Sequence, residues 1–217
     1  MNKAFIFDMD GVIVDSENAW REYALGFFEQ LVGSKIAKKV GDLIGMSVNE
    51  EYEKSVKYGL SIPKDIFVKA YDEKAAYVYS KSNITQGVDK LVKELIELGY
   101  KIGLVSSSRQ NWINHVLKRL SFTEEIKCVI SINDQGFPPK PNPAAYKETI
   151  KKLDATADST IIIEDSNRGI QAAKAAGAFV IGFRGNLVDG YQQHGADAYA
   201  GTMREVIKIV ESIKLPL

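Results

Sequence analysis

Two kinds of hydrophobic spacing divide this chain of 217 residues. Residues 16 to about 82 carry apolar side chains at intervals of three and four, which is typical of amphipathic helices. From Gly87 onwards, short apolar runs alternate with helical stripes, and one further apolar run lies at residues 4–7. Strands that alternate with helices predict a parallel sheet with right-handed crossovers. We therefore expect an α/β fold that carries an all-helical insert.

The expected strands are the apolar runs, and the expected helices lie between them. Strands are predicted at residues 4–7, 100–105, 127–132, 160–163 and 178–183, with one more near Ala198. Helices are predicted at residues 88–96, 112–120, 143–153, 169–176 and 203–210. On this division, residues 1–15 and 83–217 form the α/β core, and residues 16–82 form the insert.

Capping signals mark the helices of the insert. Asp15-Ser16 offers an N-cap to the first helix. Ser47-Val48-Asn49-Glu50 has the pattern of a capping box, and the helix behind it is expected to end near Gly59. Pro63 is expected to open another helix. Ser80-Lys81-Ser82-Asn83 is interpreted as a polar linker that leads back to the core.

Composition and charge narrow the classes of protein that the chain can represent. Hydrophobic residues make up 45% of the chain and charged residues 26%, as is common in globular proteins. Lysine plus arginine and aspartate plus glutamate both number 28, so the formal net charge is zero. Binders of nucleic acids or membrane surfaces are normally basic, and we expect neither partner. The sequence shows neither a signal-peptide pattern nor an apolar run of membrane-spanning length, which predicts a cytoplasmic protein.

Polar clusters follow three of the expected strands. They are Asp8 with Asp10, Ser106-Ser107-Ser108, and Glu164 with Asp165. Because ligands bind outside the carboxyl ends of parallel strands, neighbouring strands would bring these clusters together. Each cluster alone is also consistent with a capped turn between a strand and a helix, and for the three serines alone the capped turn is the favoured interpretation.

The four carboxylates among these residues predict a bound cation. Asp8 and Asp10 point to the same side if the backbone stays extended, and like charges at one sheet edge repel each other. Ligands that are all oxygen atoms suit Mg²⁺. The sequence therefore predicts a Mg²⁺ site.

Lys140 lies in a stretch that prolines make stiff. Pro141 biases Lys140 away from the helical region, and Pro143 suits a first helical turn with Asn142 as its cap. A solvated surface lysine needs no such restraint. We therefore expect Lys140 to contact a phosphate group or to balance the carboxylates.

Four motifs in the order found in one family give the chain a resemblance to haloacid dehalogenase (HAD) superfamily phosphatases, in the group of β-phosphoglucomutase and small sugar phosphatases. They are Asp8-Met9-Asp10-Gly11-Val12, Ser106 after Gly103-Leu104-Val105, Lys140-Pro141, and Glu164-Asp165-Ser166 with Gly169-Ile170. The match spans nearly the whole chain. The resemblance implies a Rossmann-like core, a helical cap within residues 16–82, and Mg²⁺ as cofactor.

The resemblance also implies a role for each site residue. Asp8 would attack phosphorus and form an aspartyl-phosphate, and Asp10 would act as general acid and then as general base. Asp8, Glu164 and Asp165, with the backbone carbonyl of Asp10, would hold Mg²⁺. The transferred phosphoryl group would be held by Ser106, Ser107 and Lys140. Gln86 and Ala144 depart from the usual family residues, and neither lies at a catalytic position.

Three functions remain open at this point. The favoured one is a phosphatase of a small phosphorylated metabolite, with a sugar phosphate as the favoured substrate. A phosphomutase is the alternative, but Trp20 and Val48 stand where the resembling mutases carry a histidine and an arginine, and Lys74 is no clear match for their cap lysine. A non-catalytic relative is the third. The loss of a motif acid would indicate this third function, but all the motif acids are present. No Gly-x-Gly-x-x-Gly follows the first strand, which argues against dinucleotide binding. The exact ester, the specificity residues of the cap and the oligomeric state are not indicated by the sequence.

Overall fold

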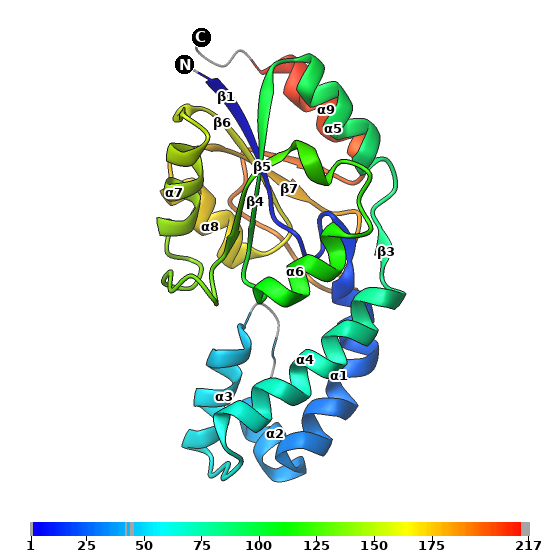
Figure 1. Ribbon diagram of the computed structural model, residues 1–217, viewed down its shortest axis with the longest axis vertical. Coiled ribbons are helices and arrows are strands. Elements are labelled where there is room, and N and C mark those ends of the chain that lie inside the picture. The colour runs from blue at the N-terminus through cyan, green and yellow to red at the C-terminus, as the bar shows by residue number, and fades with distance from the viewer. Residues whose placement is uncertain (1, 42, 44–45, 214–217) are drawn as a thin grey trace.

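A six-stranded parallel sheet forms the centre of the larger of two lobes in the computed structural model, which describes residues 2–41, 43 and 46–213 (Figure 1). Its strand order is β5-β4-β1-β6-β7-β8. The strands are β1 (Asn2–Phe7), β4 (Tyr100–Ser106), β5 (Ile126–Ser131), β6 (Ala155–Glu164), β7 (Phe179–Phe183) and β8 (Ala198–Ala200). All neighbouring pairs are parallel, which confirms the predicted α/β class with a Rossmann-like core.

Helices cover both faces of this sheet. One face carries α5 (Val88–Glu97), α6 (Gln110–Leu117) and α9 (Met203–Ser212), and the other carries α7 (Ala144–Lys152) and α8 (Asn167–Ala175). Side chains of β1 alternate between the faces, as the period of two requires. Phe5 and Phe7 pack in one hydrophobic cluster, and Ala4 and Ile6 pack in the other.

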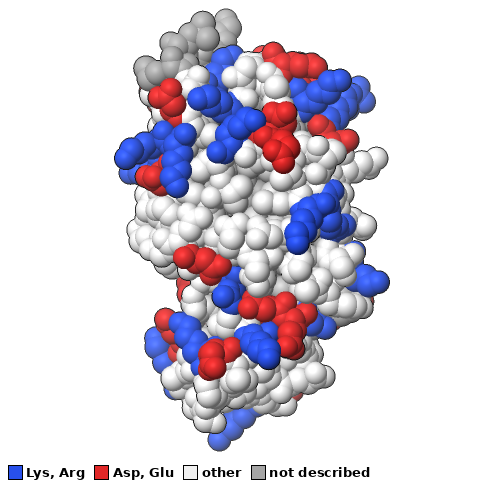
Figure 2. All heavy atoms as spheres, in the orientation of Figure 1, with Lys and Arg blue, Asp and Glu red and all other residues white. Residues whose placement is uncertain are grey.

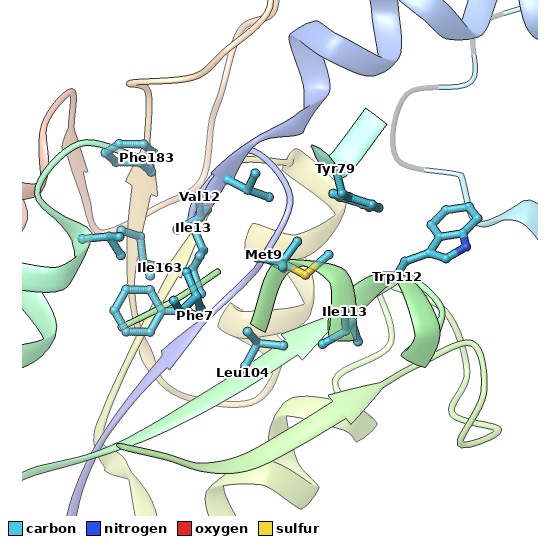
Figure 3. Packing of buried hydrophobic residues seen from close by; sticks show 14 of the residues in the cluster. Phe7, Met9, Val12, Ile13, Tyr79, Leu104, Trp112, Ile113, Ile163 and Phe183 are labelled. Carbon is cyan, nitrogen blue, oxygen red and sulfur yellow. The ribbon is translucent and has the colours of Figure 1, made fainter. Parts of the chain in front are cut away.

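The smaller lobe consists of helices inserted between two short strands. These helices are α1 (Ser16–Val32), α2 (Ser34–Val40), α3 (Val48–Lys57) and α4 (Lys64–Lys81). Strands β2 (Val14–Asp15) and β3 (Asn83–Ile84) pair antiparallel where the chain leaves the core and returns to it. The two lobes share one packed interior, and Figure 3 shows the buried side chains from Phe7 and Met9 towards Tyr79 and Trp112.

Three details of the insert differ from the sequence-based expectation. Helix α2 was not predicted, because Ser34–Val40 is short and carries one fully buried residue, Val40. The expected linker over residues 80–83 is wrong, since α4 continues to Lys81 and Asn83 pairs with Asp15 in the β2–β3 ribbon. Asp15 occupies the N-cap position but makes no capping hydrogen bond with its side chain, which accepts one from Asn18 instead.

The capping box of α3 is confirmed. The Ser47 hydroxyl accepts a hydrogen bond from the Glu50 backbone N–H, and the Glu50 carboxylate accepts one from the Ser47 backbone N–H at 2.8 Å. Such reciprocal contacts satisfy two N–H groups that a helix start otherwise leaves open. This fixes the direction in which the first turn of α3 presents its side chains.

Strand β1 lies between β4 and β6, so the three polar clusters meet. Phe7 pairs with Leu104 on one side and with Ile163 on the other. The Asp8 backbone N–H then donates to the Ile163 carbonyl at 3.0 Å. Register therefore places the residues after Phe7 level with the ends of β4 and β6.

On the face of the molecule in Figure 2, basic side chains lie interspersed with acidic ones. Among the described residues, no helix has the length and apolar character needed to cross a membrane.

Candidate active site

Asp8 lies at the centre of the site and is tied to Lys140. Lys140 Nζ is 2.6 Å from Asp8 Oδ1 and 2.5 Å from Glu164 Oε1. Both partners are buried, and the Tyr146 hydroxyl also donates to Glu164 Oε1, at 2.6 Å. The lysine that the sequence singled out therefore balances two of the predicted acids, as expected from its stiff surroundings.

Three carboxylates gather where a cation would be held. Asp8, Glu164 and Asp165 each offer an oxygen, and these oxygens all lie within 4.8 Å of one another. An all-oxygen set of this size suits Mg²⁺, which binds few protein carboxylates and fills its remaining positions with water or phosphate oxygens. The side chain of Asp10 is not part of this group, which is compatible with the predicted contribution of its backbone carbonyl. The residues present therefore fit a Mg²⁺ ion.

Two glycines make room for this group. Gly11 has a φ of +74°, and a Cβ atom there would lie 2.1 Å from Asp165 Oδ2. A Cβ atom on Gly169 would lie 1.9 Å from the Glu164 carboxyl group. Real Cβ atoms do not approach that closely, so these two motif glycines let the backbone pass beside Asp165 and Glu164.

The electrostatics of the group favour a cation. Burial raises the pKa of Asp8 well above its ordinary value; Lys140 opposes this rise, and the Glu164 and Asp10 carboxylates add to it. Burial likewise raises the pKa of Asp165, and neighbouring carboxylates raise it further. Burial alone would lower the pKa of Lys140, but Asp8 and Glu164 raise it well above its ordinary value. The site thus buries more acids than bases, so ionising all of them is costly, and a divalent ion would lower that cost.

Asp10 accepts hydrogen bonds from a set of hydroxyl groups. Ser16 and Tyr79 donate to Oδ1 at 2.6 and 2.8 Å, and Ser108 donates to Oδ2 at 2.6 Å, with Ser106 further away at 3.4 Å. Two of these donors belong to the inserted helices, because Ser16 begins α1 and Tyr79 lies near the end of α4. The position of Asp10 is therefore set by both lobes.

The serines after β4 do not share one role. Ser106 is fully buried, and its hydroxyl accepts a hydrogen bond from the Ser108 backbone N–H at 2.9 Å. Ser107 and Ser108 line the cavity described next, whereas Ser106 does not. The structure thus brings both Ser106 and Ser108 to Asp10, and it places Ser107 and Ser108 at the cavity.

A cavity of about 610 Å³ lies between the lobes and reaches Asp8, Asp10 and Lys140. This size is in the range of small-molecule sites. The insert contributes aromatic and apolar walls, and the loop after β7 closes another side. These walls include Trp20, Met46, Val48, Tyr71, Tyr79, Leu187, Val188 and Tyr191.

Polar contacts join the lobes around the cavity. Arg168 of α8 bonds to Glu50 of α3 at 2.8 Å and donates to the Lys140 carbonyl at 2.8 Å. Asp72 of α4 accepts from Arg109 at 2.9 Å and from the Trp112 indole at 2.7 Å. These contacts connect the inserted helices to the core beside the cavity.

Sequence reasoning missed three side chains that contact the predicted site residues: Ser16, Tyr79 and Tyr146. Ser108 was included in the predicted polar cluster after β4 but was given no role, and it donates to Asp10. The sequence did contain a signal for Ser16. A serine at the start of a helix can bond elsewhere when its neighbour takes the N-cap position, as Asp15 does here. Tyr79 and Tyr146 had none, since a tyrosine on a helix stripe looks the same whether its hydroxyl is used or not.

Comparisons with known proteins agree with this arrangement. Residues 5–183 match the family model described as haloacid dehalogenase-like hydrolase. A putative phosphatase of Bacillus subtilis, YhcW, is 32% identical over 181 residues, which is 82% of this chain and 81% of that protein. The β-phosphoglucomutase of the same organism is 27% identical over 83% of this chain and 82% of its own length. Hexitol phosphatase B of Escherichia coli is 27% identical over 80% of this chain and 79% of its own length.

The match to the family model covers all four motifs and most of the sheet. The residues of those motifs are the ones that meet around Asp8. The chain belongs to the haloacid dehalogenase-like hydrolases.

Proposed function

We propose that this protein is a Mg²⁺-dependent phosphatase that hydrolyses a small phosphorylated metabolite, a sugar phosphate, through an aspartyl-phosphate. One observation carries the proposal: Asp8 reaches a cavity of metabolite size while Lys140 and two further acids surround it. The names of the phosphatases among the relatives support the same chemistry.

In this proposal Asp8 is the nucleophile. Its Oδ1 is oriented by Lys140, which leaves the other carboxylate oxygen to attack phosphorus. The ammonium group of Lys140 lies where it can also neutralise charge on the transferred phosphoryl group. Ser106 and Ser107 are the further predicted contacts of the phosphoryl group. The bond from phosphorus to the leaving oxygen breaks as the bond to Asp8 forms.

Asp10 moves the protons. It would give a proton to the leaving oxygen, and it would then take one from the water that attacks the aspartyl-phosphate. The hydroxyl groups of Ser16, Tyr79 and Ser108 hold both of its oxygens and so fix its direction. Closure of the inserted helices, proposed here to be a cap over residues 16–82, completes this set and excludes bulk water.

Asp8, Glu164 and Asp165 would hold Mg²⁺, together with the Asp10 carbonyl. When bound, the ion supplies positive charge that lowers the repulsion between the carboxylates and the phosphate.

The cavity walls favour a phosphatase over a mutase. A mutase has to grip a second phosphate group, for which charge-assisted contacts are the strong ones. Trp20 and Val48, which stand where the resembling mutases carry cationic or imidazole side chains, both line the cavity. Lys74 is not among the described lining residues, and its ammonium group lies over the rings of Phe27 and Tyr77.

The test follows two products from one substrate. Purified protein with Mg²⁺ is given β-glucose 1-phosphate, and inorganic phosphate and glucose 6-phosphate are measured over time, with glucose 6-phosphate as a second substrate. We expect phosphate release with little isomerisation. Isomerisation much faster than phosphate release would show that the protein is a mutase, and release of neither product from a panel of sugar phosphates would refute the proposed activity.

A further inference from the structure

The cavity contains a group of aromatic rings that come from both lobes. Trp20, Tyr71 and Trp112 all line the cavity. The centroid of the Trp112 ring lies 5.5 Å from that of Trp20 and 6.3 Å from that of Tyr71, with interplanar angles of 32° and 16°. Flat apolar walls of this kind bind the face of a ring or a carbon chain and add no charge.

Glu51 is the polar group set into this wall. It follows the capping-box residue Glu50 in the first turn of α3, but the two side chains have opposite roles. Glu50 bonds to Ser47 and to Arg168, whereas Glu51 lines the cavity and is 6% exposed. Within the described part of the chain, the Tyr71 hydroxyl is the one hydrogen-bond partner of the Glu51 carboxyl group. A buried carboxyl group with so few partners has hydrogen-bonding capacity left for a ligand.

The basic residues of the cavity are already paired with acids. Among the described lining residues, three are basic. Lys140 is bonded to Asp8 and Glu164, Arg109 to Asp72, and Arg168 to Glu50. Each therefore already has a carboxylate partner, and a second anionic group on a substrate would have to compete with it.

We propose that Glu51 and Tyr71 form a hydrogen-bonding subsite for a hydroxyl group of the leaving group. Together with the rings of Trp20 and Trp112, this subsite selects phosphate monoesters whose leaving group is uncharged and hydroxylated over those that carry a second anionic group. The inference rests on the proposed phosphatase function and deepens it, since it names the substrate class.

Two physical effects support this selection. Burial raises the pKa of Glu51 to about 8, so its carboxyl group is mostly protonated at neutral pH and can donate as well as accept a hydrogen bond. A sugar hydroxyl can satisfy that group without any charge being buried. A second phosphate or a carboxylate would lose its hydration beside an acid, and it could gain a charge-assisted contact from Arg109 or Arg168 only by displacing Asp72 or Glu50.

The test compares leaving groups and Glu51 variants. The substrates are glucose 6-phosphate, phenyl phosphate (no hydroxyl on the leaving group) and two esters with a second anion, fructose 1,6-bisphosphate and phosphoglycolate. The variants are Glu51→Leu, which removes the polar group, and Glu51→Gln, which keeps a donor and an acceptor. Glu53→Leu, at an exposed position of the same helix, is the matched control.

For Glu51→Leu we expect kcat/KM on glucose 6-phosphate to fall about three- to tenfold, mainly through KM, which corresponds to one neutral hydrogen bond. On phenyl phosphate the same variant should match wild type, which also shows that it is folded. Glu51→Gln and Glu53→Leu should stay close to wild type on both substrates. Wild type should hydrolyse glucose 6-phosphate at least tenfold more efficiently than either doubly anionic ester.

Several outcomes would overturn the inference. An equal loss on phenyl phosphate and glucose 6-phosphate would mean that Glu51 has a structural role. No loss on either would mean that the subsite does not exist. Efficient hydrolysis of the doubly anionic esters by wild type would refute the selection while the phosphatase function stands. Wild type that hydrolyses no ester at all would instead refute the proposed function, and the inference with it.

Discussion

The buried acid Glu51 should leave a measurable trace in the pH dependence of stability. Burial raises its pKa from 4.5 to about 8, with a further rise from Glu50 on the same helix and an opposing effect of the hydrogen bond from Tyr71 on α4. The folded protein therefore keeps this proton between pH 4.5 and 8, while the unfolded chain loses it. The stabilisation from protonated Glu51 is complete below pH 4.5 and decreases as the pH rises towards 8.

The size of the effect follows from the linkage relation. Each pH unit in this window costs about 1.4 kcal/mol of unfolding free energy, so Glu51 should account for a loss of about 3 kcal/mol between pH 5 and pH 7. The variant Glu51→Gln cannot lose a proton at that position. Its free energy of unfolding relative to wild type should therefore rise by about 3 kcal/mol between the two pH values.

Urea unfolding of wild type, Glu51→Gln and Glu53→Gln at pH 5 and pH 7 measures this difference. Glu53 is exposed on the same helix, so its variant should follow wild type at both pH values. Other carboxyl groups titrate in all three proteins and cancel in the comparison. Parallel pH dependences for wild type and Glu51→Gln would refute the conclusion that Glu51 is protonated in the folded state.

Two further predictions concern the catalytic group. Hydrolysis of a generic aryl phosphate should require Mg²⁺, stop with EDTA and return when Mg²⁺ is added in excess. The reason is that the atoms offered by Asp8, Glu164 and Asp165 are all oxygens. Equal activity after metal removal would contradict the metal assignment. Tyr79→Phe should lower kcat about tenfold with little change in KM, because it removes a hydroxyl donor to the Asp10 carboxylate. Tyr77→Phe, at an exposed position of the same helix, is the control, and an unchanged kcat in Tyr79→Phe would show that Asp10 does not depend on this contact.

The sheet and the acids at its edge could be predicted because both depend on local patterns. Apolar runs such as residues 160–163 indicate buried strands wherever they lie, and a polar cluster after such a run marks the end of the strand. Which strands are neighbours was left open by the sequence, and the observed order, with β1 between β4 and β6, brings Asp8 to Glu164. Lys140 could be found from a local pattern as well, since its prolines are adjacent in sequence.

The features that the sequence did not reveal depend on long-range packing. The hydroxyl of Tyr79 reaches Asp10 across 69 positions of the chain, and no local pattern encodes that contact. Glu50 and Glu51 are adjacent residues of the same type, so the sequence does not distinguish them. The capping box holds the Glu50 side chain at Ser47, whereas the helix period places Glu51 at the cavity. Helix α2 was missed because a seven-residue helix carries too little periodicity to be recognised.

The central claim is that Asp8 is the nucleophile of a phosphatase, and the Asp8→Asn variant tests it most directly. An amide is nearly isosteric with the carboxylate but is a poor nucleophile. Phosphate release from glucose 6-phosphate with Mg²⁺ should fall to the background rate, while the unfolding temperature stays equal to that of wild type or rises, because one charge leaves a crowded group of buried acids. Release of phosphate at the wild-type rate by folded Asp8→Asn would contradict the account.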